Sequence, residues 1–287
     1  MRFATIQAAN GPRAVVQKGD DFIDLNATDA AIPNCVKTIL EGGPDLLTTI
    51  GEVVDQSNAV KLPVAGTKYL PPILNPQKIM CIGLNYKDHA AEQGIEPPSE
   101  PILFSKYPTA LVGHEAAIHL PAVSHEVDFE AELVLVIGKS GRHIKANEAM
   151  EYVGGFMNGH DVSARDWQLR KPGKQWMSGK TFDTFGPTGP ILVTSDEVGD
   201  PHNLAIQLRL NGETMQDSNT SQLIFGVGPT LEYISQIVTL HPGDLIFTGT
   251  PPGVGVFRNP PVFLKGGDVV EIEIEKLGVL RNPVVQD

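Results

Sequence analysis

The sequence predicts a β-rich α+β protein in which a small N-terminal unit precedes a larger one. Residues 131–138 (AELVLVIG) are an almost continuous run of β-branched and leucine side chains, which is typical of a buried strand. Residues 204–216 (LAIQLRLNGETMQ) alternate apolar and polar side chains and then turn at Asn211-Gly212, a strong hairpin signal. Helical spacing is confined to a few segments, so strands are expected to dominate the fold.

The N-terminal unit is expected to span residues 1–70, and the larger unit residues 71–287. Two strand-like runs flank a turn at Asn10-Gly11, and residues 46–56 (LLTTIGEVVDQ) have apolar spacing that suits a helix. Residues 69–77 (YLPPILNPQ) contain three prolines and are expected to form an extended connector between the two units.

The larger unit begins with a short buried strand at residues 78–84 (KIMCIGL). A helix is expected to start at Asn147, a cap candidate, and to run through NEAMEYVGGFM. A second helix is expected from Pro229, a helix-entry residue, through PTLEYISQIVTL. In the last strand, residues 269–275, the three glutamates alternate with apolar residues and are expected to form a solvated face instead of a metal site.

Composition excludes several classes of function. The 287-residue chain has 34 acidic and 22 basic residues, a formal charge of −12, so nucleic acid is not an expected partner. Its two cysteines, Cys35 and Cys81, cannot build a disulfide framework or a zinc site. No apolar run approaches membrane-spanning length, and the N-terminal segment resembles neither a secretion signal nor a transit peptide. We therefore expect a cytoplasmic protein.

The stretch NYKDHAAE, residues 85–92, places His89 and Glu92 three residues apart after the first strand of the larger unit. In a helical turn these positions are neighbours, so the carboxylate can orient the imidazole as a general base. A solvent-exposed ion pair is the alternative interpretation of the same spacing.

The run DFEAEL, residues 128–133, sends Asp128, Glu130 and Glu132 to one face of a strand. Three like charges leading into a buried strand repel one another unless a cation lies between them. Carboxylate oxygens are the preferred ligands of Mg²⁺ and Mn²⁺, so a divalent-metal site is favoured over an exposed acidic edge.

The run GHDVSARDWQ, residues 159–168, offers a further carboxylate, Asp161, at a strand end. Arg165 and Gln168 follow four and seven residues later, on the same side of a helical turn, where they can bind a substrate carboxylate or carbonyl. A structural salt bridge of Arg165 with Asp161 or Asp166 is the alternative.

Two other segments are candidates for binding negative charge. Lys180 lies among small and aromatic residues and can stabilise an enolate or oxyanion. Residues 247–257 (FTGTPPGVGVF) have the glycines of a backbone cradle without the Lys-Ser/Thr of a P-loop. We expect this cradle to present N–H groups and the hydroxyl of Thr248 or Thr250 to an anion.

Together, NYKDHAAE, DFEAELVLVIGK, GHDVSARDWQ, GKTFDTFGP and GDLIFTGTPPGVG resemble the fumarylacetoacetate hydrolase superfamily, in family order, from about Lys78 to the C-terminus. The resemblance implies a mixed β-roll or sandwich of that family's C-terminal-domain type, preceded by a small N-terminal domain. It also implies a homodimer, one Mg²⁺ or Mn²⁺ per subunit, and 2-oxo acid substrates.

The resemblance also implies roles for particular residues. Asp128 is expected to support the ligands without binding the metal. The implied metal ligands are Glu130, Glu132 and Asp161, the implied catalytic residues are His89, Glu92 and Lys180, and the substrate-contacting positions are Arg165, Gln168 and Thr250.

The expected reaction is hydrolysis of a carbon–carbon bond in an acylpyruvate, a 2,4-dioxo acid. His89, held by Glu92, would deprotonate the attacking water, and the cation would stabilise the enolate that leaves. Decarboxylation of oxaloacetate, or its keto–enol tautomerisation, would use the same enolate. A non-catalytic protein that binds a 2-oxo acid is a further alternative, because fold and metal site do not by themselves choose the reaction.

Overall fold

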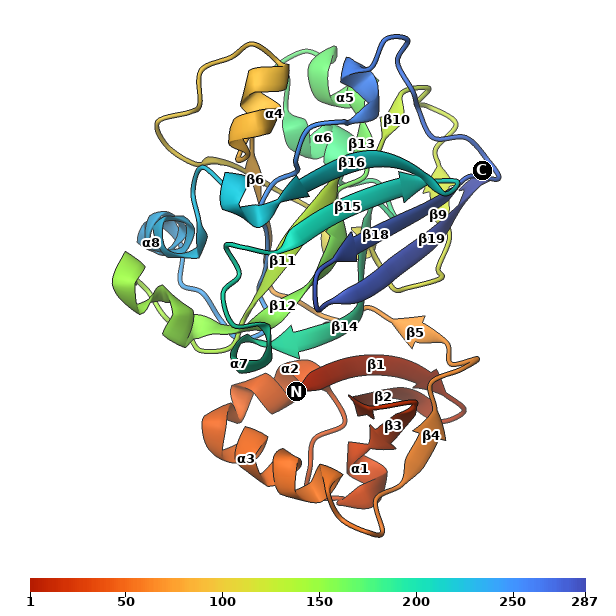
Figure 1. Cartoon of the computed structure of the whole chain (residues 1–287), viewed down its shortest axis with the longest axis vertical. Helices are drawn as coiled ribbons and strands as arrows, with labels where there is room; N and C mark the ends of the chain where they lie inside the picture. The colour runs from red at the N-terminus through yellow and green to blue at the C-terminus, as the bar shows by residue number, and fades with distance from the viewer.

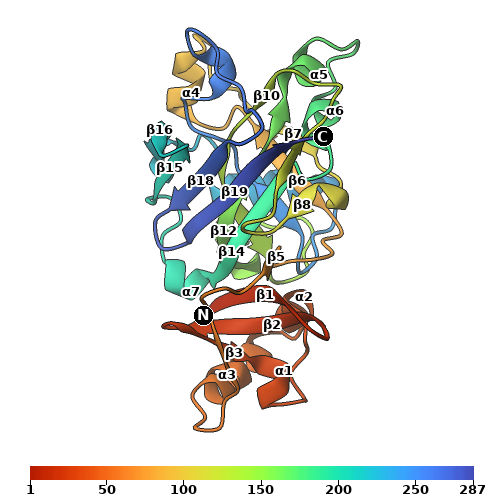
Figure 2. The same ribbon diagram turned by 90° about the vertical axis from the view of Figure 1, so that its right-hand side faces the viewer.

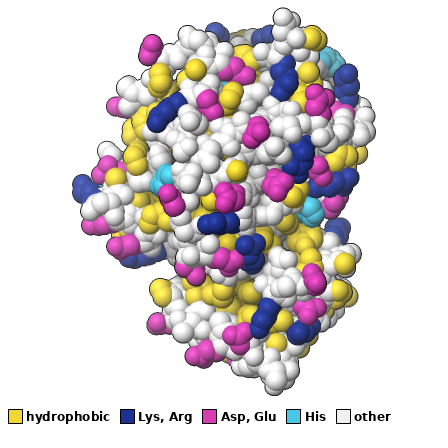
Figure 3. Space-filling model, in the orientation of Figure 1, with side chains coloured by type: hydrophobic (Ala, Val, Ile, Leu, Met, Phe, Trp, Pro, Cys, Tyr) yellow, Lys and Arg dark blue, Asp and Glu magenta, His cyan; other side chains and the backbone are white.

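The computed structural model describes residues 1–287 and has nineteen strands and eight α-helices, in agreement with the β-rich α+β prediction (Figure 1). The first 70 residues lie at one end of the molecule and the rest form the larger body, as both Figure 1 and Figure 2 show. Acidic and basic side chains are intermixed over the face in Figure 3. None of the helices combines the length and apolar character needed to cross a membrane.

The N-terminal region is an antiparallel meander with helices packed against it. The expected turn at Asn10-Gly11 is present, and Gly11 has the positive φ of 106° that this turn requires. Its elements are β1 (Arg2–Ala8), β2 (Gly11–Lys18), β3 (Asp21–Asp24), α1 (Leu25–Thr28), α2 (Val36–Glu41), α3 (Gly43–Val54), β4 (Lys61–Pro63) and β5 (Tyr69–Leu70).

One large sheet runs through both regions in the order β4-β3-β2-β1-β14-β12-β11-β17-β6-β7. The two regions meet where β1 pairs with β14, with Phe3 opposite Leu192. The strands of the larger body in this sheet are β6 (Ile79–Gly83), β7 (Ile102–Ser105), β11 (Ala131–Ile137), β12 (Val153–His160), β14 (Gly186–Thr194) and β17 (Leu245–Phe247), while β8 (Leu111–Val112) pairs with β14.

A second sheet packs across the first, which makes the body a two-layered β structure (Figure 1). The Asn211-Gly212 turn joins its first two strands, as the sequence predicts. Its order is β16 (Glu213–Asn219), β15 (Ala205–Leu210), β18 (Val269–Ile274), β19 (Gly278–Gln286) and β9 (Ile118–Leu120), and a separate pair is β10 (Val127–Asp128) with β13 (Ser163–Ala164).

Short helices cover the ends of the sheets. The helix expected from Pro229 begins two residues earlier, at Val227. The remaining helical elements are α4 (Lys87–Glu92), α5 (Arg165–Leu169), α6 (Trp176–Lys180), α7 (Ser195–Val198), α8 (Val227–Ile237) and the 3₁₀ turns η1 (Pro108–Ala110), η2 (Ala146–Tyr152), η3 (Thr220–Gln222) and η4 (Gly255–Phe257).

The helix expected from Asn147 through residues 153–157 is wrong in its second half. Residues 146–152 form the 3₁₀ turn η2, and the chain continues as strand β12 from Val153. A side chain at Gly155 would lie 2.3 Å from the carbonyl oxygen of Val193, so the glycine permits the close pairing of β12 with β14. Strand pairing on both sides of β12 overrides the local helical spacing.

Strand β11 is buried on both faces, which explains its continuous apolar run. Leu133 and Leu135 pack toward the second sheet, whereas Val134 and Val136 belong to a cluster that also contains Phe3 of β1. The site described next begins at the start of this central strand.

Candidate active site

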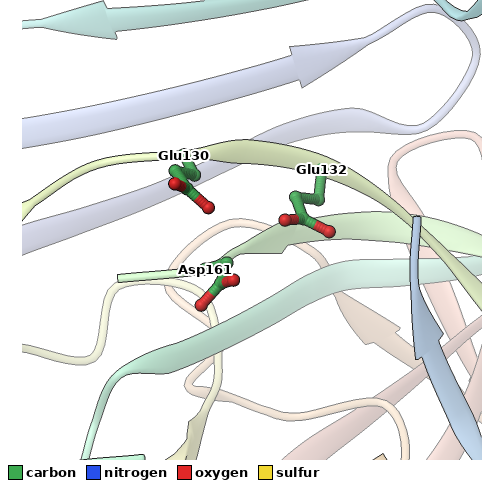
Figure 4. Close-up of side chains that lie close together, drawn as sticks. All are labelled: Glu130, Glu132 and Asp161. Carbon is green, nitrogen blue, oxygen red and sulfur yellow. The ribbon is translucent and has the colours of Figure 1, made fainter. Parts of the chain in front are cut away.

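Three carboxylates converge at the start of β11 and the end of β12 (Figure 4). Glu130 directly precedes β11 and Glu132 lies on it, and Asp161 follows the neighbouring strand β12, where its N–H donates to the carbonyl of Glu130 at 3.0 Å. One oxygen from each carboxylate lies within 4.8 Å of the others. All three side chains are buried, with Glu132 and Asp161 no more than 1% exposed.

Two buried cations lie against these acids. Lys180 Nζ donates to Glu130 Oε2 at 2.7 Å and to Asp161 Oδ2 at 2.8 Å. Arg165 Nη2 donates to the other oxygen of Glu130 at 2.6 Å. The helices α5 and α6, which carry Arg165 and Lys180, therefore close one side of the carboxylate cluster.

The alternative for Arg165, a structural salt bridge with Asp161 or Asp166, does not form with these partners. Arg165 Nε pairs instead with Asp128 at 2.8 Å, in addition to Glu130. Its Nη1 donates to Gln168 Oε1 at 2.8 Å, so the expected neighbours Arg165 and Gln168 do meet. Two of the five guanidinium N–H groups remain for other partners.

Lys106 is a member of the site that sequence reasoning missed. Its Nζ is fully buried, lies 2.6 Å from Asp161 Oδ1, donates to the carbonyl of Phe185 at 2.7 Å, and also contacts the carbonyl of Lys180. The single signal in the sequence is a lysine placed directly after a strand, at the end of β7. Its neighbours come from distant parts of the chain, which spacing alone does not reveal.

The charges of the site leave one carboxylate without a cation. Burial raises the pKa of Glu130, but Lys180 and Arg165 outweigh it and lower that pKa to about 2. Glu132 forms no ion pair, and burial, followed by Asp161 and Glu130, raises its pKa well above the ordinary value. A divalent cation bound by the three oxygens would relieve this repulsion, so the donor set fits a hard metal ion.

Lys180 remains a cation in this setting. Burial lowers its pKa, but Asp161 and Glu130 raise it above the ordinary value. Its Nζ also stands 5.2 Å from the ring centre of Phe104. Lys180, whose sequence neighbours are small and aromatic, is therefore paired in the fold with two carboxylates from distant segments.

The glycine-rich segment 248–256 binds the protein's own carboxylates. Gly249 N–H donates to Glu132 at 2.7 Å, and Gly253 N–H donates to Glu92 at 3.0 Å. Gly255 and Val256 donate to the two oxygens of Asp128 at 2.6 and 3.0 Å. The cradle exists, but four of its N–H groups hold these acids, which corrects the expectation that it serves an external anion.

The predicted pair of His89 and Glu92 forms on α4. His89 Nδ1 lies 2.9 Å from Glu92 Oε2, and the imidazole is 4% exposed. Burial raises the pKa of Glu92, but its bonds to His89 and Gly253 outweigh burial and lower it. Glu92 therefore stays ionised and can hold a proton on Nδ1.

Gln93 is a second residue that sequence reasoning missed. Its Nε2 lies 2.9 Å from His89 Nε2, the imidazole nitrogen that Glu92 leaves free. Asn85 fixes the chain just before α4, because its side chain donates to the carbonyls of Phe225 and Thr248 at 3.0 and 2.8 Å.

A cavity of about 100 Å³ joins these parts. The hydroxyl of Thr250 accepts a hydrogen bond from Gln216 at 2.8 Å, so it is partnered within the wall. Of the nine residues singled out from the sequence, Glu92 and Asp161 contact the wall residues, and the cavity is lined by the other seven, His89, Glu130, Glu132, Arg165, Gln168, Lys180 and Thr250.

The fold and this cavity define a β-rich protein whose buried carboxylate cluster suits a divalent cation and whose pocket contains a carboxylate-oriented imidazole. Residues 78–285 match the model of the fumarylacetoacetate (FAA) hydrolase C-terminal domain. The chain belongs to this family and is an enzyme of the family, as the motifs in the sequence suggested.

Similar proteins extend this result over the whole chain. The human protein named oxaloacetate tautomerase FAHD2A, mitochondrial, is 50% identical over 99% of this chain and 92% of its own length. The Xenopus laevis protein named oxaloacetate tautomerase fahd2, mitochondrial, is 50% identical over 99% and 90%. A maleylpyruvate hydrolase from Sphingobium sp. SYK-6, solved with manganese(II) and pyruvate, has a TM-score of 0.83 and 30% identity over 100% and 99% of the two chains.

These relatives contradict the expected location. The human and Xenopus laevis relatives are both named as mitochondrial, so the cytoplasmic expectation is corrected.

Proposed function

We propose that this enzyme interconverts the keto and enol forms of oxaloacetate, with a divalent cation held by Glu130, Glu132 and Asp161. The observation that carries the proposal is that a carboxylate cluster suited to a cation and a carboxylate-oriented imidazole meet at one cavity. The names of the relatives favour this reaction over the carbon–carbon hydrolysis expected from the sequence.

The proposed roles follow from the contacts. When bound, the cation would supply Lewis-acid stabilisation of negative charge on the 2-oxo oxygen. His89, whose Nδ1 proton is held by Glu92, would take the proton from carbon 3 with Nε2. The return of a proton to the 2-oxo oxygen gives the enol, and the same steps in reverse restore the keto form.

The cationic residues would hold the substrate and its charge. The two N–H groups that Arg165 keeps free suit a substrate carboxylate. Lys180, which stays protonated, would stabilise the developing oxygen anion. Gln93 is neutral, so substrate can replace its bond to His89 without stranding a buried charge.

The test measures enol absorbance and pyruvate release from oxaloacetate in parallel, with Mn²⁺, with Mg²⁺ and with EDTA. We expect metal-dependent tautomerisation without pyruvate release. His89→Ala should slow it by about 10²- to 10⁴-fold, while calorimetry shows unchanged Mn²⁺ binding. Tautomerisation that EDTA does not affect, or that His89→Ala retains, would contradict the proposal.

Hydrolysis of an acylpyruvate is the second candidate, because a solved relative is a maleylpyruvate hydrolase and the His89–Glu92 pair can also activate water. Pyruvate release from acetylpyruvate, lost in His89→Ala, would favour it. Ligand binding without turnover, unchanged in that variant, would favour a binding protein. A homodimer also remains our proposal, and light scattering of the purified protein tests it.

A further inference from the structure

The feature that leads beyond this function is the connection between α5 and α6, beside the cavity mouth. Residues 167–180 contain four basic residues and no acidic ones, in a chain with a formal charge of −12. On the other side of the cavity, residues 88–100 contain four acidic residues and no lysine or arginine. Both views place α4 and the α5–α6 pair at the end of the body away from the N-terminal region (Figures 1 and 2).

Some basic residues of this segment form ion pairs with acidic side chains, whereas others do not. Lys180 is buried in the carboxylate cluster, and Arg170 pairs with Glu126 at 2.6 Å. Lys171 and Lys174 are exposed and take part in none of the ion pairs of the structure. Lys171 stands over the ring of Trp167 at 4.5 Å, a contact that restrains the ammonium group without neutralising it.

A tight turn fixes the two free lysines relative to each other. The N–H of Lys174 donates to the carbonyl of Lys171 at 3.1 Å, and Pro172-Gly173 occupy the centre, the order of a type II turn. Gly173 has a φ of 79°, as this turn requires at its third position. The turn therefore holds two positive charges at its two ends.

Lys174 lines a hollow of about 390 Å³ that adjoins the catalytic cavity. The hollow is formed by two short segments, 102–105 and 174–177. Phe104 and Trp176, whose ring centres are 5.7 Å apart, line both the hollow and the cavity and so form the wall between them. The side chains of Phe104 and Trp176 therefore separate a ligand bound near Lys174 from the catalytic cavity.

We propose that the Lys171–Lys174 turn is a specificity-determining element that attracts dianionic 2-oxo acids to the cavity. The formal charge of the chain repels such substrates. Uncompensated positive charge at the entrance raises the local concentration of anions and their association rate. The inference deepens the proposed function, on which the choice of oxaloacetate rests.

The test compares the wild type with Lys171→Gln/Lys174→Gln, using Mn²⁺-loaded enzyme. At low ionic strength we expect kcat/KM for oxaloacetate to fall about 3- to 10-fold with kcat unchanged. The loss should vanish in about 0.5 M NaCl, where the Debye length is below about 5 Å. Lys68→Gln/Lys145→Gln makes the same change of two charges on exposed lysines that form no ion pair, and should leave both constants unchanged.

The binding rates of ligands that do not react test the role of the turn independently of the proposed reaction. Stopped-flow tryptophan fluorescence, to which Trp176 in the cavity wall contributes, should show slower oxalate binding to the double variant, with a smaller loss for pyruvate. Coulomb energy scales with ligand charge. The logarithm of the fold-decrease in association rate should therefore be about half as large for pyruvate, a monoanion, as for oxalate, a dianion.

The outcomes are distinct. If wild-type enzyme does not convert oxaloacetate but oxalate binds more slowly to the double variant, the proposed function fails and the role of the turn stands. If oxaloacetate is converted and both proteins have equal kcat/KM at low salt, the turn proposal is overturned and the function stands. Equal oxalate rates, equal losses for the two ligands, or no oxalate binding would also overturn the turn proposal.

Discussion

Glu132 is the residue on which the proposed metal site depends most directly. It is 1% exposed, forms no ion pair, and receives one hydrogen bond, from Gly249. Glu130 and Asp161, in contrast, each contact lysine. A buried carboxylate without a cation destabilises a fold, so its presence here favours a role in binding.

Glu132→Gln keeps the shape of the side chain and removes its charge. We expect Mn²⁺ affinity to fall by at least about 10- to 100-fold, judged by calorimetry. The free energy of unfolding of the metal-free protein should not decrease, because an uncompensated buried charge is lost. Glu213→Gln, on an exposed strand, is the matched control. Unchanged Mn²⁺ affinity in Glu132→Gln would exclude it as a ligand.

His114 gives a residue-scale prediction of pH dependence. Burial lowers its pKa, and its Nδ1 accepts the N–H of Arg281 at 3.0 Å. As pH falls below the ordinary value of about 6.5, the unfolded chain binds a proton before the folded one does, so stability decreases. In urea unfolding, His114→Gln should lose less stability than wild type between about pH 7 and pH 5. Equal losses would argue against this assignment.

The sequence identifies the site residues better than it identifies their partners. The run from Asp128 to Glu132, with Asp161 at a strand end, predicts a carboxylate cluster suited to a cation, and the family resemblance selects Glu130, Glu132 and Asp161 within it. The local spacing of His89 and Glu92 predicts their contact. Lys106 and Gln93 could not be found this way. The partners of Lys106 become neighbours only after β7, β12 and α6 have packed, and no local pattern encodes that contact.

At the scale of elements, the glycine-rich segment 248–256 organises three acids at once. Its N–H groups hold Glu132, Glu92 and Asp128, which belong to the carboxylate cluster, to α4 and to the pair with Arg165. The segment can do this because Gly253 has a φ of 100° and packs against the carbonyl of Met215. A displacement here should disturb the base and the metal site together.

Gly253→Ala tests this coupling. A Cβ at that position would lie 2.2 Å from Met215 O, so the segment must shift and its bond to Glu92 should break. We expect kcat/KM to fall about 10-fold or more and stability to fall by about 1–3 kcal/mol. Gly212→Ala, at a φ of 82° with no atom within 4 Å of the new Cβ, isolates the backbone strain and should retain activity. Equal activity in the two variants would contradict the coupling.

The sequence predicts strands correctly where apolar and polar side chains alternate clearly. It fails where pairing with neighbouring strands, and not the spacing of apolar residues, determines the structure. The alternating strands β15 and β18, and the turn at Asn211-Gly212, follow directly from the sequence. Residues 153–157 do not, because the pairing of β12 on both of its edges determines their structure. Gly154 and Gly155, which disfavour a helix interior, are the local signal against a helix.

At the scale of the whole molecule, one sheet and one apolar cluster join the N-terminal region to the body. Phe3, Val16 and Ile39 share a cluster with Val134 and Leu192, beneath the pairing of β1 with β14. The boundary near residue 70, which the prolines suggested, remains a prediction. Shared burial of this kind favours unfolding in a single cooperative transition.

Phe3→Ala tests the connection, because Phe3 is fully buried at the junction. Truncation should cost about 3–5 kcal/mol. Both tryptophans, Trp167 and Trp176, lie in the body, so their fluorescence transition in urea should move together with the far-UV circular dichroism. A fluorescence midpoint that stays in place while the circular dichroism midpoint moves would show that residues 1–70 unfold separately.

The acids and the imidazole of the cavity occupy parts of the chain that tolerate change very differently. Glu130 and Glu132 lie at the start of β11, which is buried on both faces and paired on both edges, and Asp161 directly follows its neighbour β12, so substitutions there endanger folding. The imidazole is carried by the short helix α4 at the rim of the body (Figure 1). During evolution, the residues around His89 can therefore change while the carboxylate cluster is retained. New reactions can arise in this way on the same fold.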